Sequence, residues 1–197
     1  MLNVGVEYEI RKLEIDLDVI INRIVALGAK KKGIFHQKRY VYDFSPVQKG
    51  RWIRLRTNGT DSTLTIKEIK SLRIDGTNEL EIVVSDFDET NRILNKLGYQ
   101  PRTFQENFRM EFELNGVDFD FDTWPGIPTY MEIEGNSEID VVNAVERIGL
   151  KLSEFTTLDV DSVYKQVYGI DLDQIKELRF TEAENAKIAS LIKEYNN

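Results

Sequence analysis

Residues 108–122 read FRMEFELNGVDFDFD, and this stretch decides the fold. Apolar and charged side chains alternate on both sides of Asn115-Gly116, a dipeptide typical of a two-residue hairpin turn. The alternation predicts two antiparallel strands, each with one apolar face and one charged face. Asp118, Asp120 and Asp122 share the charged face of the second strand and repel one another. A bound cation would relieve that repulsion.

The same period of two recurs along the chain. It predicts strands near residues 3–14, 34–44, 51–58, 62–70, 77–85, 101–114, 116–124 and 128–135. Helices are predicted where an acidic or hydroxyl side chain precedes a run that is apolar on one side. Three of them run from Asp16 or Asp18 to Gly28, from Asp86 to Gly98 and from Ser137 to Gly149, and a fourth runs from Thr181 towards Tyr195.

Composition excludes several kinds of site. Lys and Arg number 26 against 34 Asp and Glu, and this net charge of −8 argues against nucleic-acid binding through broad phosphate neutralisation. The chain has no Cys and one His, so thiolate sites and histidine-rich metal sites are excluded. Any metal would bind mainly to oxygen ligands, which suits Mg²⁺, Mn²⁺ or Ca²⁺. No signal core or apolar run of about 18 residues is present, so we expect a soluble, cytoplasmic protein without a membrane partner.

The charged strand faces have two interpretations. An open antiparallel sheet would turn its apolar face to a core and its charged face to solvent. A closed barrel would turn the apolar faces outward, under helices, and gather acids and bases in a lumen where Coulomb interactions are several-fold stronger than in water. Glu, Asp and Arg fill the charged positions with little dilution by neutral polar residues, which favours the barrel. Such a lumen would bind a polyanion that carries a divalent cation.

Several of these positions also match a family pattern. Glu7-Tyr8-Glu9-Ile10-Arg11 resembles the ExExK signature of the CYTH superfamily, the triphosphate tunnel metalloenzymes. The resemblance covers roughly residues 4–170 and continues through Arg54-Leu55-Arg56, Thr65-Ile66-Lys67, Glu79-Leu80-Glu81, Arg109, the stretch 122–126 and Glu132-Ile133-Glu134. It implies an α+β fold, an eight-stranded antiparallel closed β-tunnel with flanking helices. Residues 1–172 would form the tunnel domain, and residues 173–197 a helical extension packed on the same domain.

The resemblance also implies roles for individual residues. The catalytic set would be Glu7, Glu9, Arg11 and Asp122. Mg²⁺ or Mn²⁺ would be bound by Glu7, Glu9, Asp122 (or Asp120), Glu132 and Glu134. The triphosphate would be bound by Arg11, Arg39, Arg54, Arg56, Lys67 and Arg109. Two places depart from the pattern: Arg11 replaces the signature Lys, and the segment 36–43, HQKRYVYD, replaces the usual QxDxY and adds Arg39 as a phosphate ligand.

Other conspicuous residues are given structural roles. Trp52 and Trp124 are expected to pack, and His36 to be a surface or strand residue rather than a catalyst. The acids of the Glu79-Leu80-Glu81 motif are expected to partner the arginines of the lumen. The segment 161–169 is expected to pack on the domain, with closure of one tunnel mouth as the alternative.

Three functions remain open at this stage. The first is a metal-dependent hydrolase of inorganic triphosphate, thiamine triphosphate or a nucleoside triphosphate, with in-line attack of water on the terminal phosphorus. The second is an adenylate cyclase that forms cyclic AMP and pyrophosphate from ATP. The third is a non-catalytic binder of triphosphate or nucleotide, which the change to Arg11 would explain. Hydrolysis is favoured because the segment expected to recognise a base is altered. A homodimer is expected only by analogy with the family.

Overall fold

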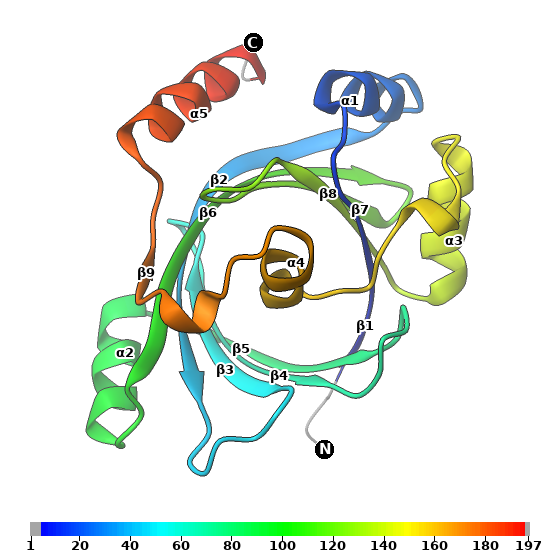
Figure 1. Cartoon of the computed structure of the whole chain (residues 1–197). Helices are drawn as coiled ribbons and strands as arrows, with labels where there is room; N and C mark the ends of the chain where they lie inside the picture. Colours follow the sequence, from blue (N-terminus) through cyan, green and yellow to red (C-terminus); the bar gives the residue numbers. More distant parts are fainter. Residues whose placement is uncertain (1–4, 196–197) are drawn as a thin grey trace.

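The computed structural model describes residues 5–195. Within them, eight antiparallel strands close into a barrel, and most of the helices lie outside its wall (Figure 1). The strands are β1 (Gly5–Lys12), β2 (Lys30–Asp43), β3 (Arg51–Thr57), β4 (Ser62–Ile69), β5 (Thr77–Val84), β6 (Pro101–Leu114), β7 (Val117–Thr123) and β8 (Tyr130–Gly135). Their order is β2-β3-β4-β5-β1-β8-β7-β6, and pairing of β2 with β6 closes the ring. The short β9 (Glu177–Leu178) pairs with β6 in parallel.

The eight strands predicted from the alternation are confirmed within the described residues, with one larger difference in their bounds; residues 3 and 4 of the first predicted strand lie outside the described part of the chain. The turn at Asn115-Gly116 has positive φ angles of 55° and 80°, as a tight hairpin turn requires. β2 begins at Lys30 rather than near residue 34. Its first residues are three lysines followed by Gly33, so they carry no alternating signal, and a bulge after Lys31 interrupts the register with β6.

The four predicted helices are confirmed as α1 (Leu17–Ala26), α2 (Phe87–Lys96), α3 (Glu138–Arg147) and α5 (Glu182–Tyr195). The predicted caps begin three of them: Asp16, Asp86 and Ser137 each accept a hydrogen bond from a backbone N–H three residues later. At α5, Thr181 and Glu184 form a reciprocal capping box. One further helix, α4 (Val160–Val167), was not predicted as a helix.

The hydrophobic core lies outside the barrel wall. α1 and α3 pack on the outer faces of β1, β6, β7 and β8, with Ile24, Phe119 and Val145 among the buried side chains. α2 covers the outer faces of β2 and β3 through Leu94, which joins a cluster around Leu55. The apolar strand faces therefore point outward and the charged faces point inward, so the interpretation as an open sheet with one solvated face is wrong.

The C-terminal segment packs on the barrel. Leu191 and Tyr195 of α5 contact the core under α1 and α3, and Ile188 is buried. Near its other end, the Glu184 carboxylate accepts a hydrogen bond of 2.7 Å from the backbone N–H of Gly126, in the loop after β7. Among the described helices, none has both the length and the apolar character needed to cross a bilayer.

Candidate functional site

The interior of the barrel contains a cavity of about 220 Å³. All eight strands of the barrel contribute side chains to its lining, and most of these side chains are charged. The period of two explains this, because each strand turns every second side chain inward. The cavity is therefore the charged lumen that the alternation predicted.

Carboxylates gather on one side of the cavity, on the neighbouring strands β1, β8 and β7. The register of β1 and β8 places Glu9 beside Glu134 and Arg11 beside Glu132. On the next strand, Asp122 lines the same side of the cavity. Because these carboxylates share one confined space, their mutual repulsion must be offset by cations.

Two arginines are interleaved with these carboxylates. Arg11 Nη2 lies 2.8 Å from Glu9 Oε2 and 2.7 Å from Glu132 Oε2. Arg109 Nη2 lies 2.5 Å from Asp122 Oδ2 and 3.1 Å from Glu132 Oε1. Burial acts to raise the pKa of Glu132, but Arg11 and Arg109 outweigh burial and lower it. Glu132 is thus held ionised between two guanidinium groups.

Glu134 has a different environment, although it lies only two residues away on β8. Among residues 5–195 its side chain forms no hydrogen bond or ion pair. Burial, together with the charges of Glu132, Glu7 and Glu9, raises the pKa of Glu134 to about 7. A carboxylate that has no ion-pair partner and lies among other carboxylates is a candidate ligand for a hard divalent cation.

This donor set fits Mg²⁺ or Mn²⁺ in its chemistry, because every candidate ligand is a carboxylate oxygen. Within the described part of the chain, no three acidic or histidine side chains converge closely enough to hold an ion. Two of the carboxylates already have cationic partners: Lys67 Nζ lies 2.8 Å from Glu7 Oε2, and Arg11 forms an ion pair with Glu9. Glu7 and Glu9 would therefore each have to exchange a cationic partner for the metal. Glu134, which forms no ion pair within residues 5–195, would not.

Cations gather on the opposite side of the cavity, on β2, β3 and β4. Arg54 Nη2 lies 2.8 Å from Glu79 Oε1 and 3.4 Å from Glu81 Oε2. Lys67 reaches Glu79 Oε2 at 3.4 Å. The prediction that Glu79 and Glu81 are partners of the lumen arginines is confirmed. These acids neutralise part of the cationic side.

Two cations on this side are not neutralised in the same way. Arg39 and Arg56 are register partners on β2 and β3. Arg56 comes no closer than 3.9 Å to Glu81 Oε2, and its pKa falls to about 10 because of Arg54 and burial. Arg39 is buried and forms no ion pair among the described residues, and burial followed by Arg54 and Arg56 lowers its pKa. A buried cation that forms no ion pair, beside a second cation that is only weakly paired, indicates an anion-binding site.

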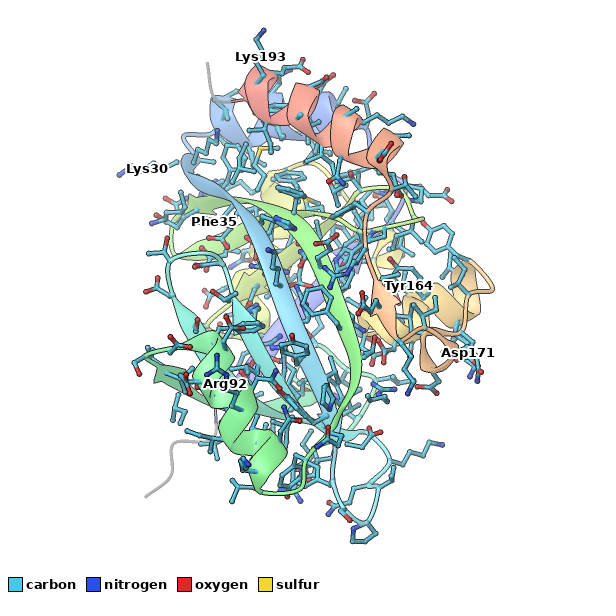
Figure 2. The ribbon with its side chains drawn as sticks, turned by 90° about the vertical axis from the view of Figure 1, so that its left-hand side faces the viewer. Lys30, Phe35, Arg92, Tyr164, Asp171 and Lys193 are labelled. Atoms are coloured by element: carbon cyan, nitrogen blue, oxygen red, sulfur yellow. The ribbon has the colours of Figure 1, made fainter. Side chains whose placement is uncertain are left out.

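α4 lies over one end of the barrel (Figure 1), and Figure 2 shows the segment that carries Tyr164 and Asp171 at that end. The first residues of this segment, 159–161, line the cavity. Tyr164 Oη donates a 2.6 Å hydrogen bond to the carbonyl of Pro125, and its ring packs edge-on against Trp124. Arg102 of β6 pairs with Asp161 at 3.2 Å and also with Asp173. The segment 161–169 thus packs on the domain and also covers one mouth of the barrel. The two roles that were considered as alternatives, packing and closure of a tunnel mouth, occur together.

Comparison with known proteins identifies the family. A family model for the CYTH domain matches residues 6–166. The chain belongs to the CYTH family. No curated protein matches it.

Solved structures share the CYTH-like fold. PH1012 from Pyrococcus horikoshii OT3 is 24% identical with a TM-score of 0.67, over 78% of this chain and 96% of that one. A proposed adenylate cyclase from Vibrio parahaemolyticus is 14% identical with a TM-score of 0.68, over 84% of this chain and 99% of that one. HpAC1 from Hippeastrum, whose structure is described as revealing a dominant triphosphatase activity, is 12% identical with a TM-score of 0.54, over 82% of this chain and 96% of that one. At these identities the likeness establishes the fold alone.

The cavity brings together nearly all the residues predicted from the CYTH resemblance. Those that line it are Glu7, Glu9, Arg11, Arg39, Arg54, Arg56, Lys67, Arg109, Asp122, Glu132 and Glu134. Asp120 shares the inward face of β7 with Asp122 but is buried and does not line the cavity, and its Oδ2 lies 2.6 Å from Arg109 Nη1. The individual roles of these residues stay predictions. His36 lies on the outer side of β2, stacked on Phe108 and 3.1 Å from Glu106, as expected of a strand residue.

Some residues of the lining were not assigned to the site from the sequence. Trp52 and Trp124 both line the cavity in addition to the packing role expected of them, and Trp124 does pack in a buried cluster with Tyr164. The alternation of β3 contained the signal for Trp52, because it places this residue on the same face as Arg54. No sequence pattern assigned Arg102 and residues 159–161 to the cavity. They come together only because α4 folds over the end of the barrel.

Proposed function

We propose that this CYTH protein is a divalent-metal-dependent hydrolase of a small molecule that contains a triphosphate. One observation carries the proposal: a single cavity inside the closed barrel has cations on β2, β3 and β4 and carboxylates on β1, β8 and β7. A triphosphate with a divalent cation matches both sides at once, because its oxygens bind guanidinium and ammonium groups and its metal binds carboxylates.

The cationic side would bind and orient the phosphate chain. Arg54 and Arg56 would donate hydrogen bonds to phosphate oxygens, and the guanidinium geometry favours paired N–H···O contacts. In the transition state, charge shifts onto these oxygens as water attacks the terminal phosphorus in line with the leaving diphosphate group, which is pyrophosphate when the substrate is inorganic triphosphate. Donors that already point into the cavity stabilise that charge without reorganisation.

The carboxylate side would hold the metal through Glu7, Glu9, Glu132 and Glu134, with Asp122 nearby. A bound Mg²⁺ or Mn²⁺ supplies neutralisation of the phosphate oxygens as a Lewis acid. The ion pair between Lys67 and Glu7 links the two sides. If Lys67 turned to a phosphate oxygen, the Glu7 carboxylate would lose its ion-pair partner and become available to bind the metal. Triphosphate and metal would therefore bind cooperatively.

Hydrolysis is preferred to cyclisation for two reasons. The cavity of about 220 Å³ lies below the ~300–1,000 Å³ usual for drug-sized ligands, which suits a compact polyphosphate better than a whole nucleotide. The segment 36–43 also lacks the usual QxDxY pattern and contributes a buried Arg39 where base recognition was expected.

The test is a substrate panel of tripolyphosphate, thiamine triphosphate and ATP with Mg²⁺ or Mn²⁺, scored for phosphate and for cyclic AMP. Phosphate release that needs metal, without cyclic AMP, is the expected result. Cyclic AMP from ATP would replace the hydrolase with a cyclase. Tight binding of all three compounds without turnover would replace it with a non-catalytic binder.

A further inference from the structure

Arg39 is held in the cavity wall by neutral groups on three sides. Its Nη2 donates a 3.0 Å hydrogen bond to Gln37 Oε1 and a second one to Asn107 Oδ1. Its Cζ lies 4.5 Å from the ring centroid of Trp124, so the indole face supports the guanidinium plane. The side chain is 7% exposed. The guanidinium is therefore held in one orientation before any ligand arrives.

The charges around Arg39 do not explain its presence. The three groups that hold it are neutral, and the nearby charged groups are mostly the cations Arg54, Arg56 and Arg109. Among the charges that act most strongly on Arg39, Asp122 is the acid, and within residues 5–195 no ion pair forms between them. A buried cation among cations destabilises the folded protein unless an anion compensates it.

The guanidinium also keeps donors in reserve. Of its five N–H groups, two belong to the Nη2 atom that is already bonded. Arg39 Nε is buried and has no hydrogen-bond partner. Nη1 likewise has none among the described residues, and Arg39 lines the cavity. A residue that served only as packing on Trp124 would not need these unsatisfied donors, since Gln or Met would fill the space at less cost.

We propose that Arg39 binds a phosphoryl group of the substrate and forms with Arg56 a two-guanidinium subsite at the α4 end of the tunnel. The subsite concerns the same cavity and so rests on the proposed function. It narrows the substrate class to molecules that place a multiply charged phosphate, rather than an uncharged or cationic group, between β2 and β3. Placed there, the phosphate would use the free donors of Arg39 and reduce the repulsion among the four arginines.

The experiment measures equilibrium binding of a methylene-bridged tripolyphosphate, which does not turn over, by calorimetry in Mg²⁺. The variants are Arg39→Gln, which removes the charge, and Arg39→Lys, which keeps it. Arg179→Gln is the matched control, because Arg179 also lies over an aromatic ring, 4.1 Å from Phe104, but is half-exposed and outside the cavity. Thermal unfolding of each variant without ligand completes the set.

The expected result is a loss of affinity of about 10- to 100-fold in Arg39→Gln, the loss of a charge-assisted contact. Arg39→Lys should recover much of this affinity, and Arg179→Gln should bind as the wild type does. Without ligand, Arg39→Gln should unfold at a temperature no lower than the wild type, because an uncompensated charge has been removed.

Unchanged affinity in Arg39→Gln, or a loss that Arg39→Lys does not recover, would overturn the subsite and leave Arg39 as a packing residue. The proposed function would survive either result. A wild-type protein that does not bind the analogue at all would instead contradict the proposed function, and the subsite with it.

Discussion

Two glutamates on the same strand should respond in opposite ways to the same substitution. Glu132→Gln should destabilise the metal-free protein, because Glu132 bridges Arg11 and Arg109 at 2.7 and 3.1 Å. Each charge-assisted hydrogen bond contributes about 1.5–3 kcal/mol. Gln can still accept one of the two, but as an uncharged acceptor, so the lost bond and the weakened one together cost about 2–4 kcal/mol. Glu134→Gln should stabilise the protein at alkaline pH, because the Glu134 carboxylate is buried beside other carboxylates and forms no ion pair within residues 5–195.

The direction in which Glu134 changes the stability of the fold with pH follows from its raised pKa. The folded protein keeps this proton up to about pH 7, whereas the unfolded chain releases it near 4.5, so stability falls as pH rises between these values. The displacement of the pKa corresponds to about 3 kcal/mol at pH 8 and to less than about 1 kcal/mol at pH 5. Glu134→Gln should recover this free energy at pH 8 and change little at pH 5.

Glu132 changes the stability of the fold with pH in the opposite direction. Its pKa in the folded protein lies below the ordinary value of 4.5, so its stabilisation is present above that value and is lost as pH falls below it. The penalty of Glu132→Gln should therefore be at its full size at pH 8.

Urea unfolding in EDTA, followed by tryptophan fluorescence at pH 8 and pH 5, measures both variants. Adding Mg²⁺ or Mn²⁺ at pH 8 should stabilise the wild type and have a much smaller effect on Glu134→Gln, since a bound ion stabilises only the fold that binds it. The description of the carboxylate side is wrong if the two variants shift stability in the same direction at pH 8. It is also wrong if the change in unfolding free energy caused by Glu134→Gln is the same at pH 8 and pH 5.

Three further outcomes are expected. Arg56→Gln should lower kcat/KM for tripolyphosphate by about 10²–10³ through loss of a preorganised donor, and an equal loss in the surface variant Arg179→Gln would contradict this. Arg11→Lys should keep substrate binding; a large gain in turnover would indicate that the natural chain is a non-catalytic binder. Arg102→Ala should speed hydrogen exchange in α4 (Val160–Val167) by removing the ion pairs to Asp161 and Asp173, and unchanged exchange rates would show that other contacts hold α4 over the barrel.

The local part of the fold was predictable because its signals are local. Alternation in the segment 108–122 assigns the inward and outward faces of β6 and β7 before any contact is known. Asn115-Gly116 specifies the turn, and Asp16, Asp86 and Ser137 mark where helices begin. The same alternation placed most of the cavity-lining residues on one face of their strands.

The closure of the barrel and the covering of its mouth were not predictable in this way. The pairing of β2 with β6 joins residues far apart in sequence, such as Arg39 with Gln105, and alternation is equally compatible with an open sheet. The partners of Arg102 lie on β2, on α4 and in the turn at 172–174, so they follow from the folded arrangement alone. Which carboxylates are neutralised also depends on rotamers, as the contrast between Glu132 and Glu134 illustrates.

The central claim is that the two sides of the cavity together hold a phosphate chain and its metal. The most direct measurement is a crystal structure with the methylene-bridged tripolyphosphate and Mn²⁺, whose anomalous scattering locates the ion. The account predicts phosphate oxygens within hydrogen-bond distance of Arg54 and Arg56, and the ion between the phosphate chain and Glu134. An analogue bound outside the barrel, or a cavity that stays filled by the present ion pairs with no analogue in it, would contradict the account.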